Sequence, residues 1–193
     1  MQIQTQKRYY TPAEYLELEE KAAYKNEYRN GEIISMTGGT TEHNKIALNF
    51  AAYFKFGMRG KGYQSFIGDV RLWIPDYTQY TYPDVMIVAG KPIYEGNNRT
   101  TIVNPCLIVE VLSKSTQNYD KGEKFTHYRS IPELQEYILI DQYSFHVEQL
   151  VKESENRWSF QEYNGENSLL KLGTIAYEIS FRDLYEEVDL KAL

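Results

Sequence analysis

The apolar stretch Pro105–Ser113 constrains the fold of this chain most strongly, because it carries one acid near its middle. Its residues read Pro-Cys-Leu-Ile-Val-Glu-Val-Leu-Ser. The stretch is too short to span a membrane and is typical of a central strand that is buried on both faces. A buried carboxylate is costly unless it is paired or binds a metal. Glu110 therefore requires a partner.

A second strand-like run, Tyr82–Ala89, contains an acid near its start, Asp84. If the two runs are antiparallel neighbours, the midpoint between Asp84 and Glu110 is position 97, within the turn-forming run Gly-Asn-Asn. This register places the two carboxylates side by side, as a hard oxygen site suited to Mg²⁺ or Mn²⁺. Two simpler interpretations remain: Glu110 forms only an ion pair with Lys124, and Asp84 is only a turn or strand-start residue.

Length and composition indicate a folded globular protein. The 193 residues, 42% hydrophobic and 15% aromatic, fit a single domain over 1–193, with a core at about 40–142. No run has transmembrane length, and no secretory leader is apparent. The only cysteine, Cys106, excludes an intrachain disulfide and a zinc site built from clustered cysteines, so we expect a cytoplasmic protein. The net charge of −6 argues against a large basic surface for nucleic acid.

The order of elements predicts an α/β fold: a mixed β-sheet flanked by helices, with an N-terminal helix and hairpin added to it. Local signals include a capping box at Thr11, an Asn30-Gly31 turn and a helix cap at Thr40 or Thr41. The remaining expected elements are strands at 64–68 and 70–74, a helix at 119–130, a strand at 136–141, a hairpin from 145–152 and 157–163, and a short helix near 181–187.

Several of these segments together resemble a known family. Pro83-Asp84 followed by Glu110 within an apolar strand resembles the PD-(D/E)XK nuclease superfamily. A closer resemblance, over roughly residues 11–149, is to a restriction-endonuclease-like family once classified as a domain of unknown function. The residues that carry it are Glu27 with Asn30-Gly31-Glu32, His43 before a helix, Tyr82-Pro83-Asp84-Val85, the strand around Glu110 with Ser113, Ser115-Thr116, Asp120 with Lys124, Tyr128, and Glu136–Asp141.

The resemblance implies a restriction-endonuclease-like core and hydrolysis of phosphodiester bonds that depends on Mg²⁺ or Mn²⁺, with nucleic acid, and DNA in particular, as the partner. Asp84 and Glu110 would hold the metal, and the backbone carbonyl of Val111 would add a ligand. A peripheral site role is considered for His43 and Glu27; the alternatives are that His43 packs or bonds the backbone at the helix start and that Glu27 is an ordinary strand surface residue. No membrane partner is expected, and a homodimer is considered.

One position departs from the superfamily pattern, which has a lysine two residues after the second acid. This sequence has Leu112 there. Three lysines compete for the role: Lys114, Lys121 and Lys124. Lys124 is favoured, because the helix that follows the strand must pack back over it and Lys124 shares a helical face with Asp120 and Tyr128.

Two hypotheses from different classes follow. The first is a metal-dependent endonuclease, with Asp84, Glu110 and Lys124 as its catalytic residues. The second keeps the fold without catalysis, as a nucleic-acid-binding or protein-interaction module. Leu112 and the acidic net charge favour the second, whereas the presence of both acids favours the first.

Overall fold

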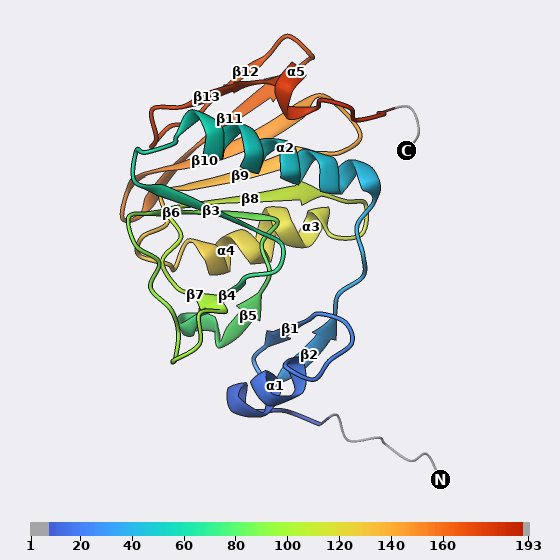
Figure 1. Ribbon diagram of the computed structural model, residues 1–193, viewed down its shortest axis with the longest axis vertical. Coiled ribbons are helices and arrows are strands. Elements are labelled where there is room, and N and C mark those ends of the chain that lie inside the picture. The colour runs from blue at the N-terminus through green and yellow to red at the C-terminus, as the bar shows by residue number, and fades with distance from the viewer. Residues whose placement is uncertain (1–7, 191–193) are drawn as a thin grey trace.

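The computed structural model describes residues 8–190, and it has mixed β-sheets with helices packed against them (Figure 1). The largest sheet has six strands in the order β11-β10-β9-β8-β6-β3. Only β8 and β9 run parallel among these neighbours; the other pairs are antiparallel, so the predicted mixed sheet is confirmed. Its strands are β3 (Tyr63–Ile67), β6 (Val85–Ala89), β8 (Leu107–Leu112), β9 (Glu136–Asp141), β10 (His146–Ser154) and β11 (Arg157–Asn164).

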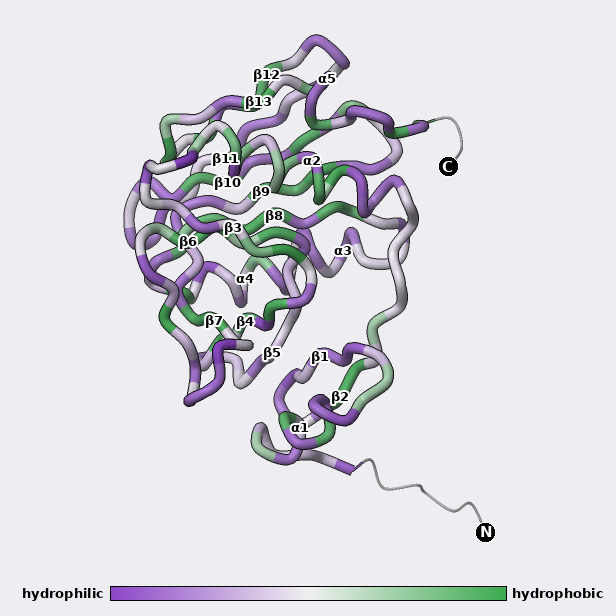
Figure 2. Tube along the Cα trace, viewed as in Figure 1, coloured by the Kyte–Doolittle hydropathy of each residue, from purple (hydrophilic) through white to green (hydrophobic). Residues whose placement is uncertain are grey.

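Both faces of the central strand β8 are buried, as its apolar sequence predicts. Leu107, Val109 and Val111 contribute to one core with α2 (Thr41–Gly57) and α5 (Phe181–Leu184). The alternate residues Ile108 and Leu112 belong to a second core, shared with α4 (Phe125–Tyr128). In Figure 1, α2 lies on one side of β8 and α4 on the other, and Figure 2 shows hydrophobic colouring along β8. Because side chains alternate along a strand, Glu110 points to the side of α4.

The N-terminal segment forms a capped helix and a hairpin. Thr11 and Glu14 form the predicted capping box at the start of α1 (Pro12–Glu19). The hairpin joins β1 (Asn26–Arg29) to β2 (Glu32–Ser35). Asn30 and Gly31 both have positive φ, at 43° and 98°. This conformation matches the two-residue hairpin turn expected from Asn-Gly.

The hairpin is not an isolated addition, because it belongs to a second sheet that the sequence did not predict. This sheet has five strands in the order β2-β1-β5-β4-β7. β1 pairs with β5, and this contact ties the hairpin to the rest of the chain. The remaining strands of the sheet are short: β4 (Arg71–Ile74), β5 (Gln79–Thr81) and β7 (Thr101–Ile102), with the 3₁₀ turn η1 (Pro75–Tyr77) between β4 and β5. Such two- and three-residue strands carry too little alternation to be recognised in a sequence.

The helical segment after β8 differs from a regular α-helix. It consists of α3 (Gln117–Tyr119), the π-helical turn η2 (Asp120–Lys124) and α4. The expectation of one helix over 119–130 was therefore close in position but wrong in geometry. A π-helical turn widens the helix locally, and such turns are frequent at functional sites.

The C-terminal part continues the large sheet and then covers it. β10 and β11 form the expected hairpin, and a small two-stranded sheet follows, from β12 (Leu169–Lys171) and β13 (Glu178–Ser180). The sequence did not predict these last two strands, and the final helix is shorter than expected. Within residues 8–190, no helix combines the length and the apolar character needed to cross a membrane.

Candidate functional site

The site begins with Asp84, directly before β6, and with Glu110 in the neighbouring strand β8. β6 and β8 are antiparallel, with Val85 opposite Val109, so the same register sets Asp84 opposite Glu110. This is the pairing predicted from the midpoint at position 97. The N–H of Val111 donates a hydrogen bond to Oδ2 of Asp84 at 2.8 Å. Backbone geometry therefore anchors one carboxylate to the strand that carries the other.

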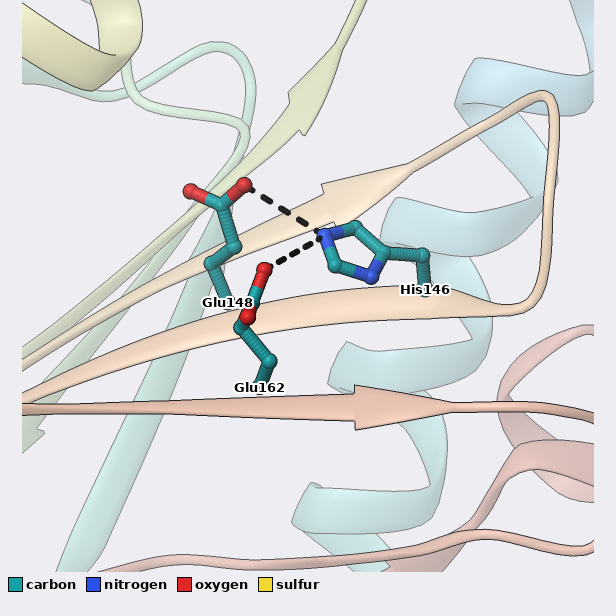
Figure 3. Close-up of side chains that lie close together, drawn as sticks. All are labelled: His146, Glu148 and Glu162. Atoms are coloured by element: carbon teal, nitrogen blue, oxygen red, sulfur yellow. Dashed lines mark hydrogen bonds and ion pairs between the residues drawn. The ribbon is translucent and has the colours of Figure 1, made fainter.

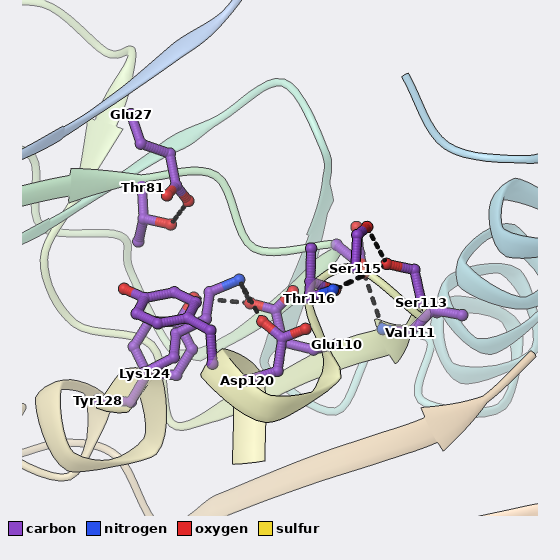
Figure 4. A network of polar contacts seen from close by, with 12 residues as sticks. Glu27, Thr81, Glu110, Val111, Ser113, Ser115, Thr116, Asp120, Lys124 and Tyr128 are labelled. Atoms are coloured by element: carbon purple, nitrogen blue, oxygen red, sulfur yellow. Dashed lines mark hydrogen bonds and ion pairs between the residues drawn. The ribbon is translucent and has the colours of Figure 1, made fainter. Parts of the chain in front are cut away.

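Glu110 is buried and has two specific partners on the helical segment after β8 (Figure 4). The hydroxyl of Tyr128 donates to Oε1 of Glu110 at 2.6 Å, and Nζ of Lys124 lies 2.8 Å from the same oxygen. Burial raises the pKa of Glu110 to about 8, with the nearby Asp84 adding to the rise and Lys124 opposing it. The ionised form of Glu110 is therefore disfavoured at this position and would be stabilised by additional positive charge.

Lys124 lies beside Glu110, on the face that the sequence argument proposed. Its side chain is 8% exposed, and Nζ is also 3.2 Å from Oδ1 of Asp120. Burial alone would lower the pKa of Lys124, but the carboxylates of Glu110 and Asp120 hold it well above its usual value. The side chain is thus a buried cation at neutral pH.

The other two lysines considered for this role lie elsewhere. Nζ of Lys121 is 2.6 Å from Oε1 of Glu148, and Nζ of Lys114 is over the ring of Tyr143, 4.8 Å from its centre. Of the three candidates, the structure brings only Lys124 to Glu110.

His43 reaches the other acid from the start of α2. Thr40 is the N-cap of this helix, and its hydroxyl accepts the N–H of His43. Nε2 of His43 lies 3.1 Å from Oδ2 of Asp84. Burial opposes the charged forms of both groups, but their mutual contact raises the pKa of His43 and lowers that of Asp84. His43 thus contacts Asp84 directly.

Glu27 comes from β1 and lies close to the same cluster. Its carboxylate accepts a hydrogen bond from the hydroxyl of Thr81 and forms an ion pair with Arg29 at 2.5 Å. Burial would raise the pKa of Glu27, but the charge of Lys124, the Thr81 hydrogen bond and Arg29 together lower it. The guanidinium of Arg29 stacks 3.7 Å from the ring centre of Tyr119, at the start of the helical segment. The second sheet therefore contributes an acid near Lys124.

The donor set suits a hard divalent cation. The contacts above use Oδ2 of Asp84 and Oε1 of Glu110, and within the described part of the chain no hydrogen bond reaches Oδ1 of Asp84 or Oε2 of Glu110. One oxygen on each acid is therefore left for a ligand, and carboxylate oxygens are what Mg²⁺ and Mn²⁺ prefer. Beside the acids, Ser113 bonds Ser115 and the backbone N–H of Thr116, which orders the connection to the helical segment.

Sequence reasoning missed or undervalued several residues at and beyond this site. The hydroxyl of Tyr128 bonds Glu110, and the hydroxyl of Thr81 bonds Glu27; the sequence predicts neither contact. His146 lies with Glu148 and Glu162 at the β10–β11 ladder, a grouping that the sequence does not predict. The signal available was the His-x-Glu alternation on one strand. The third residue, Glu162, joins the group through the pairing of β10 with β11, which the His-x-Glu alternation does not specify.

The arrangement defines a protein of the restriction-endonuclease-like class. A family model described as "Putative restriction endonuclease", named Uma2, matches residues 12–182. The chain belongs to this family. Both the predicted resemblance and the predicted fold class are therefore confirmed.

Individual relatives agree with this assignment. The uncharacterized protein sll1609 of Synechocystis sp. is 42% identical over 82% of this chain and 89% of its own length. A second Synechocystis protein, slr1290, also uncharacterized, is 33% identical over 82% of this chain and 83% of its own. A crystal structure of a "putative nuclease" from Anabaena variabilis has the same fold, with a TM-score of 0.72 and 18% identity, over 91% of this chain and 97% of that one.

Proposed function

We propose that this protein is a divalent-metal-dependent endonuclease that hydrolyses phosphodiester bonds in DNA. The observation that carries the proposal is the position of Lys124, whose ammonium lies 2.8 Å from Glu110. Glu110 is itself opposite Asp84 in the register of β6 and β8. An acid directly before β6, an acid in β8 and a buried lysine thus lie together, although the lysine comes from the helical segment and not from β8. Family membership supports a nuclease-like activity.

Each residue has a role that its contacts support. Asp84 and Glu110 would bind Mg²⁺ or Mn²⁺ through the oxygens that their protein contacts leave open, with the backbone carbonyl of Val111 as a further ligand. The bound ion would supply a water of lowered pKa and a Lewis acid for the phosphate oxygens. Tyr128 orients Glu110, and His43 orients Asp84, since each holds one oxygen of its acid.

Lys124 would stabilise the negative charge that develops on the phosphate. An ammonium has three N–H donors, and the contacts to Glu110 and Asp120 use two of them. The third is available for a non-bridging phosphate oxygen or for the attacking water. A fixed cation of this kind is effective because it needs no reorganisation during the reaction.

The competing function is a module on the same fold that binds nucleic acid or protein without catalysis. Leu112 favours this alternative, because an apolar side chain occupies the usual lysine position on the face of β8 that carries Glu110. The net charge of −6 favours it also. We further propose a cytoplasmic location, as the one cysteine, Cys106, has no disulfide partner within the chain.

A plasmid-cleavage assay separates the two functions. The wild-type chain should nick or cut plasmid DNA with Mg²⁺ or Mn²⁺ and not with EDTA, and the double variant Asp84→Asn, Glu110→Gln should be inactive. Thermal melting provides a second readout, since an ion bound only by the folded state raises the melting temperature. The metal-induced rise should disappear in Asp84→Asn, which keeps the shape of the side chain. If the folded wild type shows neither cleavage nor a metal-induced rise, the module is the better description.

A further inference from the structure

A second group of metal-ligating side chains lies outside the candidate active site, on the ladder between β10 and β11 (Figure 3). His146 and Glu148 are two residues apart on β10 and therefore share a face. Glu162 on β11 is directly opposite Glu148. Nε2 of His146 is 3.3 Å from Oε1 of Glu148 and 3.8 Å from Oε1 of Glu162. The ladder thus directs one nitrogen and two carboxylates to one point.

The side chain of Asn164 sets the orientation of the histidine ring. Nδ1 of His146 lies 2.8 Å from Oδ1 of Asn164, the residue opposite it on β11. An amide oxygen only accepts hydrogen bonds, so Nδ1 carries the proton. In the neutral ring, Nε2 therefore presents its lone pair to Glu148 and Glu162. A histidine that donates its other N–H to a protein oxygen and faces carboxylates is the arrangement found at metal sites.

The spacing of these atoms fits a tetrahedral ion. Zinc bonds of about 2.0–2.2 Å to nitrogen and oxygen put neighbouring ligand atoms about 3.4 Å apart in a tetrahedron. The observed separations of 3.3 and 3.8 Å are close to this value, and all three ligand atoms lie within 4.8 Å of one another. Small side-chain rotations would complete the geometry, and water would take the fourth position.

We propose that His146, Glu148 and Glu162 bind one Zn²⁺ ion that links β10 to β11. The mixed nitrogen and oxygen ligands select a borderline ion such as Zn²⁺, in contrast to the all-oxygen pair at Asp84 and Glu110. This site is independent of the proposed nuclease activity.

Lys121 has a defined part in this site. Its ammonium is 2.6 Å from Oε1 of Glu148, and its side chain is 40% exposed. It holds Glu148 in the absence of the ion and can turn towards solvent when Zn²⁺ takes over the carboxylate. Lys121 lies in η2, the turn that ends at Lys124.

Zinc binding by the full-length chain tests the proposal. The double variant Asp84→Asn, Glu110→Gln serves as the parent, so that the proposed catalytic site does not contribute. Equilibrium dialysis against Zn²⁺ should find one bound ion per chain. Co²⁺ should give the visible absorption bands of a tetrahedral complex, and NMR should place the metal on Nε2 of His146 with Nδ1 still protonated.

Single substitutions in this parent locate the ion. His146→Gln should abolish binding. Glu162→Gln should weaken it without unfolding risk, because the Glu162 side chain is 52% exposed. Asn164→Ala should weaken binding about 10- to 100-fold, as is typical on losing the partner that orients a ligand. Lys121→Gln should strengthen it, because a competing cation is removed.

A histidine on another element provides the control. His127→Gln should bind Zn²⁺ as the parent does, since His127 is on α4 and stacks on Tyr77. The alternative is that His146 is a protonated ring paired with two acids and holds no metal. Absence of one bound equivalent in the parent, or equal binding by His146→Gln or Glu162→Gln, would overturn the proposal.

Discussion

Lys124 offers a solution to a problem that Leu112 creates in β8. Glu110 and Leu112 point to the same face of the strand, so the usual lysine position next to the acid is apolar. Lys124 approaches this face from η2 and pairs with Glu110 there. A positive charge is thus present beside Glu110, and Lys124 supplies it from the helical segment.

Replacing Lys124 tests whether it takes the role of the lysine that is missing at position 112. Lys124→Ala should reduce DNA cleavage by about 100-fold or more, the usual size of the effect when one donor that stabilises developing charge is removed. Metal should still bind, as judged by the rise in melting temperature with Mg²⁺. Lys114→Ala is the matched control and should cleave like the wild type. Wild-type cleavage by Lys124→Ala would mean that the catalytic cation is another residue.

Glu110 should make the stability of the metal-free protein depend on pH. Burial raises the pKa of this carboxyl from its ordinary value of 4.5 to about 8. Between these values the folded state binds a proton that the unfolded chain releases. The resulting contribution to stability is fully present below the ordinary pKa and is lost as the pH rises through the raised one.

Urea unfolding in EDTA at a series of pH values measures this effect. The free energy of unfolding of the wild type should contain a component that falls with rising pH across that window, and Glu110→Gln should lack this component because its amide does not titrate. Mg²⁺ should oppose the fall in the wild type, since the ion favours the carboxylate form. Parallel pH profiles for the two proteins would show that Glu110 does not titrate in this range.

At the scale of secondary-structure elements, the β1–β2 hairpin connects the N-terminal segment to the site. β1 carries Glu27 and pairs with β5, whose residue Thr81 bonds Glu27. The turn at Asn30-Gly31 sets the register of this hairpin. Gly31 has a φ of +98°, and a Cβ atom there would lie 2.7 Å from Cδ1 of Tyr9.

Gly31→Ala should therefore destabilise the protein by at least about 1–2 kcal/mol, the cost of a left-handed backbone for an L-residue with a side chain. Cleavage should fall as well, since Glu27 would be displaced. Gly38→Ala is a suitable control, because a Cβ at Gly38 meets no atom within 4 Å and its φ is not in the left-handed range. The two melting temperatures decide the matter: a similar value for both variants would contradict the role assigned to the turn.

The elements also show where sequence reasoning succeeds. β8 and β9 were recognisable because long apolar runs bounded by turn residues leave few alternatives, and the β6–β8 register followed from the position of the intervening turn. β5 and β7 were missed because two or three residues are too few to show the alternation of a strand. The π-helical turn was missed because i→i+5 hydrogen bonding has no clear sequence signal. The contact of Thr81 with Glu27 depends on that missed strand, so it could not be foreseen.

At the scale of the whole molecule, the acids of the site and the negative net charge of the chain both oppose the attraction of DNA phosphates. The chain has 27 acidic and 21 basic residues, which gives the formal net charge of −6. Two cations near the site are already paired with acids: Lys124 with Glu110 and Asp120, and Arg29 with Glu27. Because acids neutralise these two cations, they add little net positive charge to attract phosphates.

DNA binding should consequently depend on divalent metal more than on salt. A protein that binds DNA through many lysines and arginines loses affinity steeply as salt rises, because each contact releases counterions. Here we expect weak binding in EDTA, a shallow dependence on salt, and clearly tighter binding with Ca²⁺, which occupies oxygen sites and commonly supports little cleavage. Gel-shift titrations over a range of salt measure this, with the Asp84→Asn, Glu110→Gln double variant as the control that should not respond to Ca²⁺. Tight binding in EDTA with a steep salt dependence would instead locate a basic surface as the main DNA contact, and the acidic site would then contribute to chemistry without contributing to affinity.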